Sequence, residues 1–194
     1  MNYELIAVGA SWGGLRAVGD ILDALPDDFH PTVVVAQHRR SDPADLAGLL
    51  ATRTRLPVSD VDDKDPIEPG RVYLAPPGYH LLIERGHFSL STDPPVKYAR
   101  PSIDVLFESA ADVYRERVIG VVLTGANEDG AAGLAQIKRL GGVAIVQDPR
   151  TAERGEMPSA AISATSADAI LPLEEIGPFL YGLVVTPAGD RVHP

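Results

Sequence analysis

The sequence has no cysteine, one tryptophan and few aromatic residues, which make up 6% of its 194 positions. Without cysteine, the chain can form no disulfide bond, no thiolate zinc or iron–sulfur site and no cysteine nucleophile. No apolar run approaches the roughly 20 residues needed to cross a bilayer. A secretory signal peptide has a basic stretch before its apolar segment, and no such stretch precedes the first apolar segment here. These absences predict a soluble, cytoplasmic protein without membrane insertion.

Basic residues are also scarce, because 17 Lys and Arg stand against 27 Asp and Glu and give a net charge of −10. Such a surface repels phosphates and anionic lipids, so a nucleic acid is not an expected partner. The composition, 45% hydrophobic and 23% charged, is that of an ordinary globular protein. We expect one domain over residues 1–185 and a frayed C-terminal tail over 186–194.

Short β-branched runs alternate with segments of helical periodicity. The expected strands cover 5–8, 32–37, 71–75, 118–124, 143–147 and 169–171, and the expected helices 13–25, 42–55, 102–114, 130–140, 158–164 and 174–184. Residues 81–83 and 88–90 flank a turn and predict a hairpin, whereas 60–70 reads as a loop. This pattern predicts an α/β fold: a three-layer, doubly wound, mainly parallel sheet with an antiparallel hairpin at an edge.

Chemically active side chains follow the predicted strands, at the sheet edge where doubly wound proteins place their sites. Ser11 lies in Gly9-Ala10-Ser11-Trp12-Gly13, which matches the G-x-S-x-G nucleophile elbow between a strand and a helix. His38 directly follows the second strand, and His80 is its serious rival among the histidines. The alternatives are structural: Ser11 as a helix N-cap and His38 as a histidine without a catalytic role.

Asp129 follows the strand 118–124 and is the candidate for a carboxylate that orients His38. Its alternative role is to cap the helix that comes next, and Glu128 is a competing acid. Ser11, His38 and Asp129 would then form a Ser-His-Asp triad in that chain order. The α/β-hydrolases use the order Ser, acid, His, but geometry rather than order defines a triad. This chemistry needs no metal and no organic cofactor.

A family resemblance rests on segments spread over residues 4–180. They are AVGAS at 7–11 with Gly13-Gly14, VVVAQH at 33–38, VYLAP at 72–76, RPSIDVLF at 100–107, VVLTG at 121–125 with DGAAG at 129–133, Gly141-Gly142 with Gln147-Asp148, and Met157-Pro158 with Ala160-Ala161-Ile162. In these motifs the chain resembles the catalytic domain of the chemotaxis protein-glutamate methylesterases, the CheB family. The resemblance implies that Ser11 is the nucleophile, His38 the base and Asp129 the orienting acid.

The same resemblance implies hydrolysis of glutamate 5-O-methyl esters on a chemoreceptor or related signalling protein, with release of methanol, and also permits glutamine deamidation. It places the oxyanion and cleft positions at Trp12, Gly13, Ala126 and Met157. Family members usually carry a small residue in place of Trp12 and Met-Gly in place of Ala126-Asn127, so substrate identity is open. The alternatives are a triad hydrolase of a different ester and a non-catalytic regulatory module of the same fold.

Typical family members also carry an N-terminal phosphoacceptor receiver domain that covers the active site. This chain begins at the first catalytic strand, so we expect a stand-alone homologue or an excised domain, with a separate phosphoacceptor regulator as a conceivable partner. Two basic clusters, Arg39-Arg40 and Lys97 with Arg100, are candidates for a positive rim that binds the substrate protein. The alternative is that these four residues are solvated surface charges.

Overall fold

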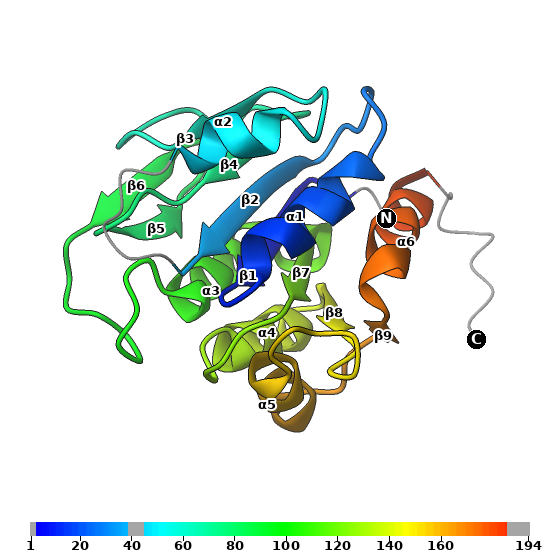
Figure 1. Cartoon of the computed structure of the whole chain (residues 1–194). Helices are drawn as coiled ribbons and strands as arrows, with labels where there is room; N and C mark the ends of the chain where they lie inside the picture. The colour runs from blue at the N-terminus through cyan, green and yellow to red at the C-terminus, as the bar shows by residue number, and fades with distance from the viewer. Residues whose placement is uncertain (1–2, 39–44, 186–194) are drawn as a thin grey trace.

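A seven-stranded parallel sheet forms the centre of the computed structural model, which describes residues 3–38 and 45–185 (Figure 1). Its strands, in spatial order, are β3 (Val58–Asp60), β4 (Val72–Leu74), β2 (Thr32–Gln37), β1 (Leu5–Ala10), β7 (Val118–Val122), β8 (Val143–Gln147) and β9 (Ala169–Leu171). β1 pairs with β2 on one side and with β7 on the other. The chain therefore reverses its direction of winding at β1, which is where such folds place their sites.

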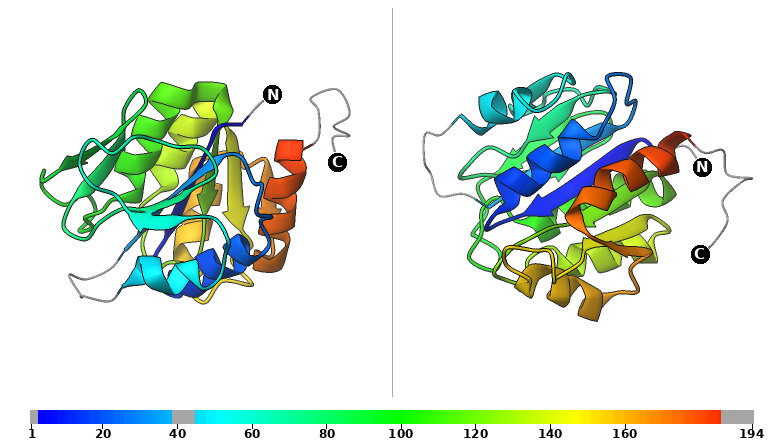
Figure 2. Two further views of the ribbon diagram at one scale, coloured as in Figure 1. Left: turned by 90° about the horizontal axis from the view of Figure 1, so that it is seen from above. Right: turned by 45° about the vertical axis from the view of Figure 1, so that its right-hand side comes forward.

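Helices cover both faces of the sheet (Figure 2). One face packs against α1 (Gly14–Asp23), α2 (Leu46–Ala51) and α6 (Leu173–Val185), and the other against α3 (Ile103–Tyr114), α4 (Ala131–Arg139) and α5 (Glu156–Ala164). Alternate residues of β1 serve the two layers: Ile6 and Val8 face α1, whereas Leu5 and Ala7 face α3. These observations confirm the predicted three-layer α/β fold.

The predicted hairpin exists as β5 (His80–Ile83) and β6 (Phe88–Ser91), but it is a separate two-stranded sheet. It pairs with no strand of the large sheet among the described residues. Leu81, Ile83 and Phe88 are instead buried in the same apolar cluster as α3. The hairpin thus packs with its side chains on the helical layer, whereas we expected its backbone to extend an edge.

The largest remaining differences from the prediction concern the helix α2 and the strand β3. The helix expected over 42–55 begins at Leu46, because the carboxylate of Asp45 accepts the N–H of Gly48 at 2.7 Å and caps it there. Residues 42–44 and the expected tail 186–194 lie outside the described residues. β3 was not predicted at all: it has three residues and none of them is buried, so its pattern carries little signal. A short 3₁₀ turn, Arg115–Arg117, leads from α3 into β7.

No helix in the part of the chain that the structure describes is long and apolar enough to cross a membrane.

Candidate active site

Ser11 lies in the tight turn between β1 and α1. Its N–H donates to the carbonyl of Thr124 at 2.9 Å, and its own carbonyl accepts the N–H of Gly14 at 2.9 Å. Gly13 has φ +74°, a left-handed conformation that glycine adopts without strain. A Cβ at Gly125 would lie 2.9 Å from the Ser11 Cβ, so the loop after β7 passes directly against this serine. The elbow predicted from the sequence is therefore present in its expected setting.

The side chain of Gln37, at the end of β2, joins the serine turn to the histidine. Its Nε2 donates to the carbonyl of Ser11 at 2.7 Å and to that of His38 at 3.0 Å. No role for Gln37 was predicted from the sequence. A polar residue that ends an apolar strand, one position before a candidate base, was the available signal.

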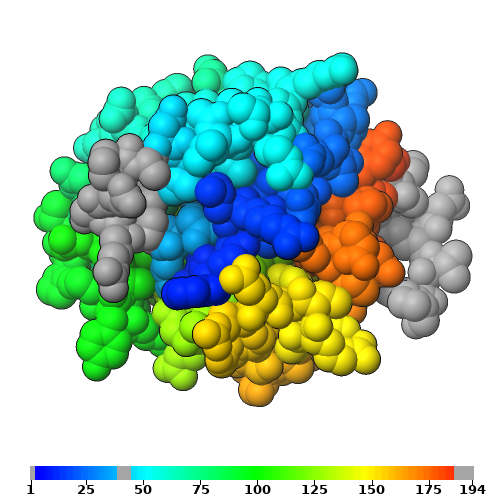
Figure 3. Space-filling model, viewed as in Figure 1, coloured from blue at the N-terminus to red at the C-terminus, as the bar shows by residue number. Residues whose placement is uncertain are grey.

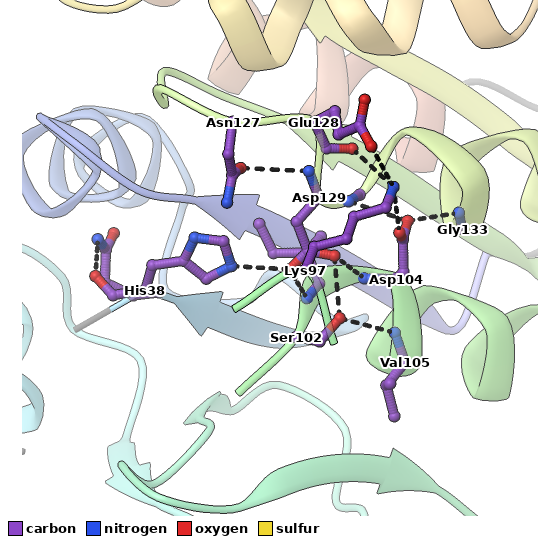
Figure 4. Close-up of polar contacts among 12 residues, drawn as sticks. His38, Lys97, Ser102, Asp104, Val105, Asn127, Glu128, Asp129 and Gly133 are labelled. Atoms are coloured by element: carbon purple, nitrogen blue, oxygen red, sulfur yellow. Dashed lines mark hydrogen bonds and ion pairs between the residues drawn. The ribbon is translucent and has the colours of Figure 1, made fainter. Parts of the chain in front are cut away.

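His38 and Asp129 are in direct contact, as Figure 4 shows. The His38 Nε2 lies 2.7 Å from the Asp129 Oδ2, and the side chains are 12% and 0% exposed. The Nδ1 atom of the ring is therefore the nitrogen left for a partner other than Asp129. No hydrogen bond joins the Ser11 hydroxyl to the His38 ring in the described structure.

Asp129 does not cap the helix that follows it, which was its alternative role. That helix, α4, begins at Ala131, and its N-cap residue is Gly130, which offers no side-chain cap. The carboxylate instead accepts the N–H groups of Ile103 at 2.7 Å and Asp104 at 3.0 Å, and the Ser102 hydroxyl at 2.9 Å. An anion is thus held at the N-terminus of α3, where the helix dipole favours it.

Opposing effects act on the pKa of Asp129. Burial raises it, but the hydrogen bonds from His38 and from the N–H groups of Asp104 and Ile103 lower it by more, so the net pKa lies below that of an ordinary aspartate. The carboxylate is therefore charged at neutral pH and suited to stabilise a positive ring at His38. The competing acid, Glu128, is exposed and directs its carboxylate and carbonyl oxygens towards Lys97.

His80, the rival histidine, forms its hydrogen bonds with Ser102 and Pro94 rather than with Ser11 or His38. It is 2% exposed, its Nδ1 accepts the N–H of Ser102 at 3.2 Å, and its Nε2 lies 3.1 Å from the carbonyl of Pro94. Because Nδ1 accepts, Nε2 carries the proton and donates it to Pro94. His80 therefore supports the start of α3, a structural role that was not predicted from the sequence.

The four predicted cleft residues differ in exposure. Trp12 is 59% exposed, and its Nε1 donates to Glu153 at 2.7 Å while the Arg154 guanidinium lies 5.7 Å from the ring centroid. The segment after β1 and the segment around residue 150 accordingly meet at the surface in Figure 3. Gly13 is half-buried and Ala126 is exposed, whereas Met157 is fully buried and donates its N–H to the carbonyl of Gly125.

Thr124, which follows β7, forms hydrogen bonds with the serine turn, with the end of β8 and with the loop after β8. Its hydroxyl donates to the carbonyl of Trp12 at 2.8 Å and accepts the N–H of Arg154 at 2.9 Å, and its own N–H donates to the Gln147 Oε1 at 2.9 Å. Thr124 thereby holds the elbow and the loop after β8 at fixed spacing. It belongs to the motif segment 121–133, but its hydroxyl was not singled out from the sequence.

The basic residues proposed as a rim have partners within the chain where they are described. Lys97 donates towards Asp104, with Nζ 3.0 Å from Oδ2, and Arg100 donates to the carbonyls of Thr92 and Asp93 at 2.8 and 3.1 Å. Both therefore have structural contacts, although Arg100 keeps an uncompensated charge. Arg39 and Arg40 lie outside the described residues.

A pocket of about 530 Å³ includes Asn127 and Glu128 of the loop that carries Asp129, but Ser11, His38 and Asp129 do not line it. It is lined by residues from the turn before α3, from the loop that carries Asp129 and from α5: Lys97, Tyr98, Asn127, Glu128, Glu156 and Ala160. No group of three or more His, Asp or Glu side chains placed to hold a metal ion occurs among the described residues.

Comparison with known proteins assigns the family. Residues 6–180 match the CheB methylesterase family. The catalytic domain of CheB methylesterase from Thermotoga maritima superimposes with a TM-score of 0.89, at 32% identity, over 95% of this chain and all of that one. The fold and the site thus define a class of protein: a hydrolase on a doubly wound sheet, with a serine in the turn after β1 and a buried His–Asp pair. The chain belongs to the CheB methylesterase family.

Curated relatives are similar over most of the chain. A Leptospira interrogans protein, provisionally named a protein-glutamate methylesterase/protein-glutamine glutaminase, is 50% identical over 91% of this chain and 92% of its own length. Protein-glutamate methylesterase/protein-glutamine glutaminase 2 of Anaeromyxobacter dehalogenans is 44% identical over 90% of this chain but 52% of its own length. The chain therefore spans nearly all of one such relative and about half of another.

Proposed function

We propose that this chain is a serine esterase that hydrolyses glutamate 5-O-methyl esters on a protein and releases methanol. The single observation that carries the proposal is the 2.7 Å contact between His38 and the buried Asp129 at the sheet edge where Ser11 forms its elbow. Membership of the CheB methylesterase family supports the ester as substrate. The fitting protein partner is a methylated chemoreceptor or a similar signalling protein in the cytoplasm, with a separate phosphoacceptor regulator as a further candidate partner.

The reaction follows from the roles of the three side chains. The Ser11 hydroxyl attacks the ester carbonyl while its proton passes to the Nδ1 of His38, and Asp129 stabilises the ring cation at Nε2. The ring then returns this proton to the departing methoxide, which leaves as methanol. Water, deprotonated by the same ring, attacks the glutamyl-serine ester and releases a glutamate carboxylate. General base catalysis of this kind contributes about 10²–10⁴ in rate.

Main-chain N–H groups of the elbow fit the role of oxyanion donors. Within residues 3–38 and 45–185, no acceptor pairs with the N–H of Trp12 or of Gly13. Trp12 and Gly13 are the two residues between Ser11 and the first residue of α1, where N–H groups favour negative charge. A hydrogen bond between a nucleophile and its base often forms or tightens only with substrate bound, which accommodates its absence between Ser11 and His38.

Glutamine deamidation is the second candidate activity, because the names of both curated relatives include protein-glutamine glutaminase. The same acyl-enzyme forms, and ammonia leaves in place of methanol. Trp12, exposed beside the elbow, favours a third possibility, a triad hydrolase selective for a different ester.

Release of methanol from a methylated receptor is the direct test. Ser11→Ala should abolish it, whereas Ser163→Ala, which removes an exposed hydroxyl on α5, should leave it unchanged. Labelling of Ser11 by a fluorophosphonate would exclude a non-catalytic module. Methanol release that survives in Ser11→Ala would overturn the proposal, and a panel of small esters and glutamine peptides would rank the alternatives.

A further inference from the structure

A second buried carboxylate, Asp104, lies directly behind the His38–Asp129 pair (Figure 4). It is 4% exposed, and its Oδ1 accepts the N–H groups of Gly130 at 2.9 Å and Gly133 at 2.8 Å. Asp104 therefore caps α4, whose N-terminus has no side-chain cap of its own. The N–H that it holds, at Gly130, belongs to the residue immediately after Asp129.

The two carboxylates cap each other's helices. Asp129 precedes α4 and accepts the N–H groups of Ile103 and Asp104 at the start of α3, whereas Asp104 belongs to α3 and holds the start of α4. A displacement of either helix would break hydrogen bonds to both carboxylates. The arrangement brings two negative charges close together with little contact with solvent, which is unfavourable unless a cation balances them.

Lys97 supplies that cation. Its Nζ lies 3.0 Å from the Asp104 Oδ2, 3.2 Å from the Glu128 carbonyl and 3.8 Å from the Glu128 carboxylate. Lys97 and Tyr98 both have positive φ, +48° and +65°, a conformation unfavourable for residues other than glycine. The strained turn brings the ammonium group to the loop that carries Asp129.

Burial lowers the pKa of Lys97, but its hydrogen bond to Asp104 and the charges of Asp104, Glu128 and Asp129 raise it by more, so its net pKa is above the ordinary value. The ammonium group is therefore charged throughout the working pH range of an esterase. It also lies within electrostatic reach of Asp129.

We propose that Lys97 and Asp104 are positioning residues for the His38–Asp129 pair, with the ammonium of Lys97 cancelling the charge of Asp104 so that the His38 ring responds to Asp129 alone. The inference rests on the proposed role of His38 as the general base. Removing Lys97 leaves the Asp104 charge uncompensated, which favours the protonated His38 ring. The activity, which needs the neutral ring, then rises only at a higher pH. Neutralising Asp104 has the opposite effect.

Other ionisable groups face Lys97 and Asp104, and they are the same in wild type and in the variants of these two residues. They are Glu108 and Asp112 on α3, Glu128 in the loop before α4, Glu156 of α5 in the shared pocket, and His80 of β5 behind Ser102. Burial, together with the charges of Asp104 and Asp112, raises the pKa of Glu108, and Lys97 partly offsets this. Arg39 and Arg40, next to His38 in sequence, lie outside the described residues.

The experiment measures the pH dependence of kcat/KM for a small methyl ester and, independently, the titration of the His38 ring by NMR. Lys97→Met should move both to higher pH by about half a unit, the size expected of one charge several ångströms away in a medium between protein and water. Asp104→Asn should move both to lower pH by a similar amount. The double variant, which lacks the whole ion pair, should return close to wild type, and Lys97→Arg should not move either.

Lys64→Met is the matched control, because Lys64 also has positive φ and pairs with Asp63 and Ser89 rather than with the site. The inference would be overturned if Lys97→Met and Asp104→Asn moved the pH dependence of kcat/KM and the His38 titration in the same direction. It would also be overturned if neither variant moved them while the free energy of unfolding fell, which would leave a purely structural role. Should Asp104→Asn fail to fold, Lys97→Met and Lys97→Arg decide, since Lys97 is partly exposed. Should wild type release no methanol, the proposed function fails, but the NMR titrations still test the inference.

Discussion

Within the site, hydrogen bonding separates two histidines that the sequence presents as rivals. His38 donates the N–H at Nε2 to the charged carboxylate of Asp129 and keeps Nδ1 for the reacting group, whereas both nitrogens of His80 are occupied by the backbone of Ser102 and Pro94. A ring with both nitrogens bonded cannot move a proton without losing a structural contact. The two residues should therefore fail in different ways when they are removed.

His38→Ala is expected to lower kcat by about 10²–10⁴, because the general base is lost. His80→Ala should change kcat by no more than a few-fold but reduce the free energy of unfolding by about 2 kcal/mol, since the Ser102 N–H and the Pro94 carbonyl lose a partner and a buried gap forms. Kinetics of the folded variants and urea denaturation measure the two effects. An equal collapse of kcat in both variants would reopen the choice of base.

The lowered pKa of Asp129 links this residue to acid stability. A carboxyl whose pKa is lower in the folded than in the unfolded chain stabilises the fold above its unfolded pKa, about 3.9, and loses that contribution as the pH falls through the folded pKa. Asp129→Asn should thus be less stable than wild type at about pH 7, with the difference shrinking below about pH 4. Urea midpoints at the two pH values measure this.

Asp112→Asn, an exposed change on the same helix α3, serves as the control and should leave the difference between neutral and acid stability close to that of wild type. If wild type and Asp129→Asn differed in urea midpoint by the same amount at both pH values, the lowered pKa of Asp129 would not contribute to stability.

Sequence patterns could identify Ser11, His38 and Asp129 because each follows a strand of a recognisable sheet. They could not identify Ser102 and Asp104 as supports, because these two residues act through contacts between segments far apart in the chain, such as Asp104 with Gly130. The same limit applies to Asp129: its alternative role was a cap on the helix that follows it, but the helix whose N–H groups it accepts is α3, which precedes it in the chain.

For the elements, the contact between α3 and α4 fixes how Asp129 is presented. Gly133 of α4 lies against α3, and a Cβ there would come within 2.5 Å of the Phe107 Cβ and 3.0 Å of the Asp104 carbonyl oxygen. Backbone atoms cannot move aside as a flexible side chain can. The absence of a side chain at position 133 is therefore needed for the two helices to exchange their caps.

Gly133→Ala should destabilise the protein by about 1–3 kcal/mol through overpacking and should also lower kcat, because separating α3 from α4 weakens the hydrogen bonds to Asp129. Gly182→Ala is the matched control, since Gly182 is within α6 and a Cβ there meets nothing within 4 Å. It should stabilise by about 0.5–1 kcal/mol through helix propensity. Thermal unfolding and kcat of both variants test this, and a harmless Gly133→Ala would show that the helices can separate freely.

Element types were predictable where periodicity was long, and less so where it was short. The central strands and α3 were predicted within a few residues of their observed bounds. The three-residue β3 was missed, and the placement of the hairpin was wrong because it depends on which apolar layer Leu81 and Phe88 join. Pairing between elements is a tertiary property, which alternation of apolar residues does not specify.

Taken as a whole, the molecule is strongly acidic, with a net charge of −10. The basic rim predicted from the sequence is reduced, where the structure describes it, because Asp104 compensates Lys97 while Arg100 alone keeps a free charge. The pocket beside the site adds the carboxylates of Glu128 and Glu156. An acidic protein substrate, which gains a further negative charge with each ester hydrolysed, therefore meets net repulsion as it approaches.

This repulsion predicts an unusual dependence on salt. Between about 10 mM and about 100 mM salt the Debye length falls from about 30 Å to about 10 Å, so long-range repulsion is screened. On an acidic methylated protein, kcat/KM should rise by about twofold to fivefold over this range, because like charges slow association. On a small neutral methyl ester it should stay constant, since no net charge is brought together.

A fall of kcat/KM with salt on the protein substrate alone would mean that a local basic rim, formed by Arg39, Arg40 and Arg100, governs association. Arg39→Glu with Arg100→Glu would then remove that fall without affecting the neutral ester.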